Sequence, residues 1–90
     1  MWYLYITKNR NGAFYTGITS NLEQRIKDHQ RGKGGYYTAH NRPIELLYIE
    51  ECSDRKKAQE RERQIKGWSR AKKQALIDGN FDKLNYLSTS

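Results

Sequence analysis

The pattern of apolar and polar positions predicts a β-hairpin at the start of the chain. Residues 2–7 are rich in aromatic and β-branched side chains, the composition of a strand. Asn11 and Gly12 form a strong turn signal, because both residue types tolerate positive φ. Residues 13–17 have the composition of the returning strand. We therefore expect an antiparallel hairpin over residues 2–17.

A helical pattern follows the hairpin. Asn21 is a suitable N-cap, and Gln24 three residues later completes a variant of the capping box. Apolar residues then recur four apart, and Gly32 is a natural stop. The spacing predicts a helix over about residues 22–31, followed by a flexible basic loop over residues 32–43.

The second half of the chain predicts one strand and two helices. Residues 44–50 are an apolar and aromatic run typical of a third strand. A second helix should begin after a cap at Ser53 or Asp54 and run to about Lys66, where Gly and Trp interrupt it. A third helix is expected over about residues 70–78, with serine before it and glycine after it.

This order of elements, ββαβαα, predicts an α+β fold: a small three-stranded antiparallel sheet flanked by helices. Ninety residues suffice for one domain and one small core. We expect the domain to occupy residues 1–80. Residues 81–90 carry apolar side chains at helix-like spacing and should form a C-terminal tail that is partly docked and partly frayed. The expected oligomeric state is a monomer.

Charge narrows the classes of function. Lys and Arg number 17 against 10 Asp and Glu, a net charge of +7, of which residues 53–90 contribute +5. A basic surface attracts polyanions, and nucleic acid is the commonest polyanion in a cell. The alternative is a solvated helix face that only keeps the domain soluble. No apolar run is long enough to cross a membrane. The lone Cys52 forms no internal disulfide and fits a reducing, cytoplasmic location.

One carboxylate stands where the helical pattern asks for an apolar residue. Ala58 and Ile65 mark the apolar stripe of the second predicted helix, and Glu62 falls between them. Burying a carboxylate without a partner would cost several kcal/mol, roughly. Two interpretations are open: a salt bridge to Arg25 or to a lysine, or a ligand for Mg²⁺, which accepts one or two carboxylates and otherwise keeps water.

Other polar side chains also border the predicted core. Arg25 and His29 lie four apart on one face of the first helix, next to its apolar stripe. Arg25 either extends its charged end into solvent or points at a phosphate near the sheet edge. Tyr5 and Tyr15 lie on the two hairpin strands. Each phenol either packs in the core or exchanges a proton with a bound water or phosphate.

The predicted loop contains side chains suited to a polyanion. Lys33 and Arg42 supply charge, and Tyr37 offers a stacking face for a base. The loop lacks the pattern of a Walker phosphate-binding loop. Lys66, at the end of the second helix, completes the set of candidate contacts to nucleic acid.

Taken together, these motifs resemble the GIY-YIG nuclease superfamily, in particular its small stand-alone bacterial members. The first motif falls on Tyr3-Leu4-Tyr5, which departs from the family pattern at its first two positions, and the second on Tyr15-Thr16-Gly17. Residues 32–48 and 69–73 also match runs habitual in those small members. The likeness extends from about residue 2 to residue 77. Asn85 is a candidate for an asparagine found late in many members.

The resemblance implies a set of site residues and a cofactor. The family's arginine falls on Arg25, its histidine on His29 and its metal-binding glutamate on Glu62. By this likeness Glu62 would hold Mg²⁺ or Mn²⁺, and Arg25 would neutralise charge on the reacting phosphate. Tyr5 would orient or deprotonate the attacking water, assisted by Tyr15 and His29. A phenol has a pKa near 10, so a basic role for Tyr5 requires nearby cations.

The implied function is a metal-dependent endonuclease that hydrolyses phosphodiester bonds in DNA. The expected substrate preference is structure-selective or weakly specific, with a place in DNA repair or recombination. Two alternatives remain open. One is a non-catalytic module that binds DNA or RNA on the same fold. The other is a nuclease subunit that needs a protein partner for targeting.

Overall fold

The computed structural model describes residues 1–30 and 43–89 of the chain. Three strands form one antiparallel sheet in the order β2-β1-β3. They are β1 (Trp2–Asn9), β2 (Phe14–Thr19) and β3 (Pro43–Cys52). The helices are α1 (Leu22–Gln30), α3 (Arg55–Lys66), α4 (Arg70–Asp78) and α5 (Phe81–Thr89). The α+β class and the predicted order ββαβαα are confirmed, with α5 as an additional helix.

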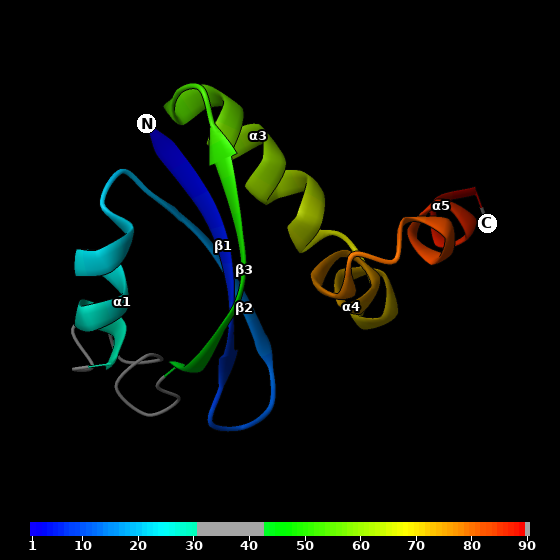
Figure 1. Ribbon diagram of the computed structural model, residues 1–90, viewed down its shortest axis with the longest axis horizontal. Helices are drawn as coiled ribbons and strands as arrows, with labels where there is room; N and C mark the ends of the chain where they lie inside the picture. Colours follow the sequence, from blue (N-terminus) through cyan, green and yellow to red (C-terminus); the bar gives the residue numbers. More distant parts are fainter. Residues whose placement is uncertain (31–42, 90) are drawn as a thin grey trace.

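The sheet is sandwiched between helices (Figure 1). Helix α1 lies on one side of the sheet, and α3, α4 and α5 lie on the other. The hairpin turn closes as predicted: Gly12 adopts φ 84°, and its amide donates to the Asn9 carbonyl at 2.9 Å. Because β1 is the central strand, β2 and β3 each leave one edge unpaired within the described chain.

Strand β3 is longer than the sequence pattern predicted. It begins at Pro43, which the sequence pattern assigns to the loop, and continues to Cys52. Proline is acceptable in this place because β3 is an edge strand, so its missing N–H interrupts no ladder on the outer side. The register of β1 against β3 shifts near this end, between Lys8 and Asn9.

Capping residues fix the ends of the helices. The Asp54 side chain accepts from the Lys57 amide at 2.8 Å and begins α3. Ser69 begins α4 in the same way, accepting from the Lys72 amide at 3.2 Å. Gly79 ends α4 in the left-handed conformation, with φ 71°. All three positions follow the pattern in the sequence, since short polar side chains cap and glycine adopts positive φ.

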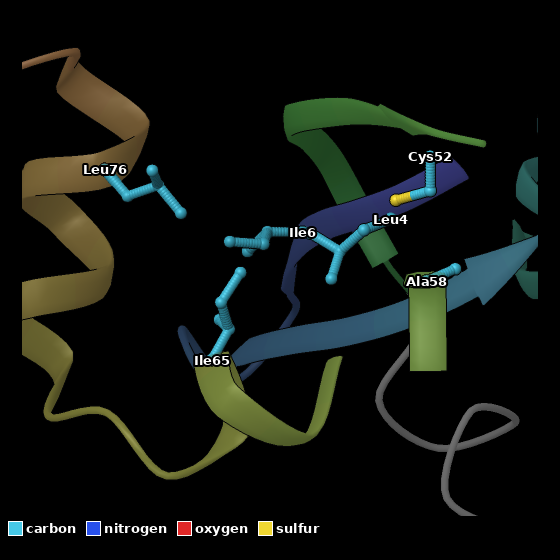
Figure 2. Close-up of a cluster of buried hydrophobic side chains, with 6 residues drawn as sticks. All are labelled: Leu4, Ile6, Cys52, Ala58, Ile65 and Leu76. Atoms are coloured by element: carbon cyan, nitrogen blue, oxygen red, sulfur yellow. The ribbon is translucent and has the colours of Figure 1, made fainter. Parts of the chain in front are cut away.

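The core lies between the sheet and helices α3 and α4. Leu4 and Ile6 of β1 are fully buried against Ala58 and Ile65 of α3. Figure 2 shows Ile65 and Leu76 directed toward Ile6, with Cys52 and Ala58 beside Leu4. Helix α5 contributes Leu84, which packs against this cluster while Phe81 and Tyr86 remain exposed. The division into a domain over residues 1–80 and a tail over 81–90 stays a prediction. None of the described helices combines the length and apolarity needed to cross a membrane.

Candidate active site at the edge of β2

Tyr5 is the buried centre of the candidate site. It lies on the central strand β1, opposite Gly17 of the edge strand β2, and is fully buried. A Cβ built on Gly17 would lie 2.6 Å from the Tyr5 hydroxyl oxygen and 2.8 Å from its Cζ. The phenol therefore crosses directly over Gly17. Only a residue without a side chain leaves room for the phenol to reach this edge of the sheet.

Tyr15 lies beside Tyr5. It belongs to β2, and the alternation of the strands places it on the same sheet face as Gly17 and Tyr5. The two rings have centroids 6.3 Å apart and are inclined at 40°, a tilted aromatic pair. The ring edge of Tyr15 also closes on Gly17, at 3.1 Å from the built Cβ. Two phenols thus line the outer edge of the sheet.

Arg25 approaches this edge from α1. Helix α1 begins after Asn21, whose side chain accepts from the Gln24 amide at 3.2 Å as predicted. One turn later the exposed Arg25 donates a hydrogen bond to the phenol of Tyr5. The helix start therefore sets where the guanidinium stands. The cation lies against the sheet edge with part of its surface open to solvent.

Glu62 approaches from α3, on the opposite side of the sheet. Ala58 and Ile65 face the core, and Glu62 stands on the flank of α3 next to them, with 24% of its side chain exposed. Its carboxylate forms an ion pair with Lys66 at 3.4 Å, one helical turn later. The structure thus contains the salt bridge to a lysine that we had considered. That lysine is 56% exposed, so the pair is weak and open to exchange.

Burial and the charges of three neighbouring elements together set the pKa of Tyr5. Burial raises the pKa of Tyr5 to about 12. The hydrogen bond and charge of Arg25 lower this pKa, whereas the charges of Tyr15 and Glu62 raise it. A basic role for Tyr5 requires cations that lower its pKa. Arg25 alone does not achieve this, because the effect of desolvation on the pKa is larger than the effect of Arg25. At neutral pH the phenol is un-ionised.

The remaining predicted residues fall into three cases. Lys66 forms an ion pair with Glu62. The His29 side chain and residues Lys33, Tyr37 and Arg42 lie outside the described part of the structure. Asn85 is exposed on α5. The catalytic, metal-binding and nucleic-acid-binding roles of all these residues stay predictions.

A polar cluster beside the site was not foreseen from the sequence. Arg61, the neighbour of Glu62, pairs with Glu50 of β3 at 3.0 Å, and the Tyr48 hydroxyl donates to Glu50 at 2.9 Å. The Arg61 guanidinium also lies 5.3 Å from the ring centroid of Trp68. A signal was present: alternation along β3 places Tyr48, Glu50 and Cys52 on the core-facing side. The Arg61–Glu50 ion pair links α3 to β3.

Comparison with known proteins identifies the family of the chain. The profile of the GIY-YIG catalytic domain matches residues 1–75. A UPF0213 protein of Staphylococcus haemolyticus is 43% identical over 76 residues, which cover 84% of this chain and 93% of the relative. A UPF0213 protein of Clostridium perfringens is 44% identical over 77 residues, covering 86% of this chain and 83% of the relative.

A solved structure of a UPF0213 protein is also similar to this chain. The solution NMR structure of the UPF0213 protein BH0048 from Bacillus halodurans is 34% identical, with a TM-score of 0.56 and full coverage of both chains. The matched range, residues 1–75, spans Tyr5, Tyr15, Arg25 and Glu62. The chain therefore belongs to the GIY-YIG family and carries its nuclease-type catalytic domain.

Proposed function

We propose that this protein is a metal-dependent endonuclease that hydrolyses phosphodiester bonds in DNA, with structure-selective or weak specificity. The observation that supports the proposal is the buried phenol of Tyr5 at the edge of β2, which accepts a hydrogen bond from Arg25 of α1 and whose pKa is also raised by the charge of Glu62 of α3. We further propose that it acts in the cytoplasm, in repair or recombination of DNA.

Arg25 is suited to binding the reacting phosphate. Its guanidinium is exposed and already held in place by the phenol of Tyr5. A guanidinium forms short, charge-assisted hydrogen bonds to phosphate oxygens. Such bonds stabilise the additional negative charge that develops on a phosphoryl group during hydrolysis. Arg25 would therefore both bind the phosphate and favour the transition state.

Tyr5 acts as a hydrogen-bond donor in this proposal. With its pKa raised to about 12 by burial, the phenol keeps its proton at neutral pH. An un-ionised hydroxyl can orient the attacking water or a phosphate oxygen, but it is a poor base in this state. Tyr15 lies next to it and supports the ring. Of the two roles considered for Tyr5, orientation is the one that the burial favours.

Glu62 is the candidate ligand for Mg²⁺ or Mn²⁺. The described residues contain no group of three His, Cys, Asp or Glu that could hold a metal by themselves. A single carboxylate still fits Mg²⁺, which keeps several waters and is completed by substrate phosphates. The Glu62 side chain is 24% exposed and is paired only with Lys66 within the described chain, and its charge acts on the phenol of Tyr5. When bound there, the ion would polarise the phosphate and stabilise the leaving oxygen.

The test is cleavage of supercoiled plasmid and of branched DNA with Mg²⁺ or Mn²⁺, in the presence and absence of chelator. We expect Glu62→Gln and Arg25→Ala each to reduce the rate by about 100-fold or more. Glu60→Gln is the matched control, because Glu60 is an exposed carboxylate on the same helix. Its rate should equal that of the wild type. Cleavage that survives both site substitutions would reject the proposal and indicate a contaminant.

One observation favours a second candidate, a non-catalytic nucleic-acid-binding module. The ion pair with Lys66 gives Glu62 a structural partner that needs no metal. Tight DNA or RNA binding without cleavage would support this module. A protein that neither cuts nor binds nucleic acid by itself would indicate a subunit that depends on a partner for targeting.

A further inference from the structure

Within the described residues 1–30 and 43–89, two segments are basic without any acidic residue. Residues 63–73 contain five Lys and Arg, and residues 8–12 contain two. Elsewhere in these ranges the basic residues are mixed with acidic ones, as in residues 54–62, which contain four basic and three acidic side chains. The excess charge of the described chain is therefore concentrated in two segments that are far apart in sequence.

Arg70 brings the two segments together. Its Nη1 donates to the Gly12 carbonyl at 2.9 Å, and its guanidinium lies 4.0 Å from the ring centroid of Phe14. The first residue of α4 is thereby fixed to the turn between β1 and β2. Figure 1 shows this turn at one end of the sheet, with α4 following directly after α3. The two basic segments thus form one surface.

The same surface continues to the candidate active site. Lys66 pairs with Glu62, and helical spacing places Arg63 on the same flank of α3. Lys72 is not counted, since its amino group lies over the Trp68 ring at 4.3 Å. Arg70 is not counted either, because its guanidinium is held by the Gly12 carbonyl and the Phe14 ring. We call the remaining set the basic band: Lys8, Arg10, Arg63, Lys66 and Lys73. It runs from Glu62 along the end of α3 to the hairpin turn.

Most charges of the band are open to a ligand. Arg10, Arg63 and Lys66 are exposed, and Lys8 and Lys73 are half-buried. Among the described residues, the only ion pair in the band is that of Lys66 with Glu62. A cluster of cations that repel one another is unfavourable unless an anion neutralises it. The band therefore indicates a polyanionic ligand that extends beyond the site itself.

We propose that the basic band binds the sugar-phosphate backbone of the nucleic acid on one side of the phosphate held at Arg25 and Glu62. This inference rests on the proposed function and specifies which surface holds the substrate. A nucleic-acid strand presents a phosphate at every nucleotide, so a row of cations leading away from the site matches it. Contacts of this kind fix the position of the substrate without reading its sequence.

The test compares two double variants of equal charge. Arg10→Gln/Lys73→Gln removes two charges from the band. The control, Lys56→Gln/Lys57→Gln, removes two exposed charges at the start of α3. This part of α3 lies at the other end of β1, because the neighbouring Arg55 is 5.6 Å from the Trp2 ring centroid. Binding of a fluorescent DNA duplex is measured against salt concentration with chelator present, so that cleavage does not interfere.

Each phosphate contact contributes a slope of about 0.9 to the dependence of log Kd on log salt. Loss of two contacts should therefore reduce the slope by about 1.8 and weaken binding by about 60-fold at 0.1 M salt. We expect this for Arg10→Gln/Lys73→Gln and a much smaller change for the control. Circular dichroism should show that both variants are folded.

Three results would overturn the inference. The band variant could keep the wild-type slope, or the two variants could weaken binding equally, which would indicate a diffuse charge effect. Polyglutamate serves as a model of an acidic protein. If the band variant lost its binding to polyglutamate but kept its binding to DNA, the surface would be assigned to an acidic protein instead. Failure of the proposed function is distinguishable, because DNA bound through the band without metal-dependent cleavage would reject catalysis and leave this inference standing.

Discussion

Gly17 offers the sharpest structural test of the site. Replacing it by alanine places a methyl group 2.6 Å from the hydroxyl oxygen of Tyr5 and 2.8 Å from its Cζ. Ordinary van der Waals contact begins at 3.4 Å, so the hydroxyl would have to retreat by about 0.8 Å. Tyr5 is fully buried, and Tyr15 closes on the same position, so the ring has no open space to enter.

The expected change in the free energy of unfolding is the difference between two opposing effects. Overpacking of a buried site costs about 1–3 kcal/mol. Replacing glycine in a strand by alanine recovers about 0.5–1 kcal/mol of backbone entropy. We therefore expect Gly17→Ala to lower the free energy of unfolding by about 0.5–2 kcal/mol. The effect on catalysis should be larger, because a shift of about 1 Å in a positioned group can cost about 100-fold in rate.

The assay combines urea denaturation with metal-dependent DNA cleavage. Gly67→Ala is the control, since a Cβ at Gly67 meets only backbone oxygens at 3.6 and 4.0 Å, and its φ is −81°. The double variant Gly17→Ala/Tyr5→Phe lacks the hydroxyl that makes the closest contact. It should be more stable than the sum of the single effects predicts. Equal stability and equal activity of Gly17→Ala and Gly67→Ala would refute the reasoning.

Further expectations concern alkaline pH, the polar cluster and the helix cap. Burial raises the pKa values of Tyr5 and Tyr48 to about 12, so stability should be complete below pH 10 and fall as the pH rises from about 10 to about 12. In alkaline titrations followed by circular dichroism, Tyr5→Phe should lose less stability than the wild type between pH 10 and pH 12. An unchanged dependence of stability on pH would contradict this expectation. Glu50→Gln should lower stability by about 1–2 kcal/mol in urea, because the Arg61 guanidinium loses its charged partner. Asp54→Ala should cost about 1 kcal/mol through loss of the cap on α3, and no change in the denaturation midpoint would show the cap to be dispensable.

Much of the fold is local in origin and was predictable. The caps at Asn21, Asp54 and Ser69 form the hydrogen bonds that the sequence indicates. The turn at Gly12 likewise adopts the positive φ that its sequence favours. Each of these features depends on residues within three positions of one another. Local patterns therefore predicted the type and approximate bounds of six elements, but not α5 as a helix of its own.

The site depended on contacts that local patterns do not contain. The position of Glu62 within an apolar stripe indicated that the residue needs a partner, but both a lysine and a metal satisfied that requirement. The raised pKa of Tyr5 could not be predicted from the sequence either. It follows from the full burial of the phenol against Gly17, and the effect of this burial is larger than the opposing effect of Arg25. The link of Arg70 to Gly12 joins residues 58 positions apart and has no sequence signature.

Paramagnetic broadening by Mn²⁺ in NMR spectra tests the central claim most directly. If Glu62, Arg25 and Tyr5 form one metal site at the edge of β2, titration with Mn²⁺ should broaden the signals of these residues before others. The Glu60→Gln variant should show the same pattern, and the Glu62→Gln variant should lose it. Broadening that persists in Glu62→Gln, or that is centred away from Arg25 and Tyr5, would contradict the claim.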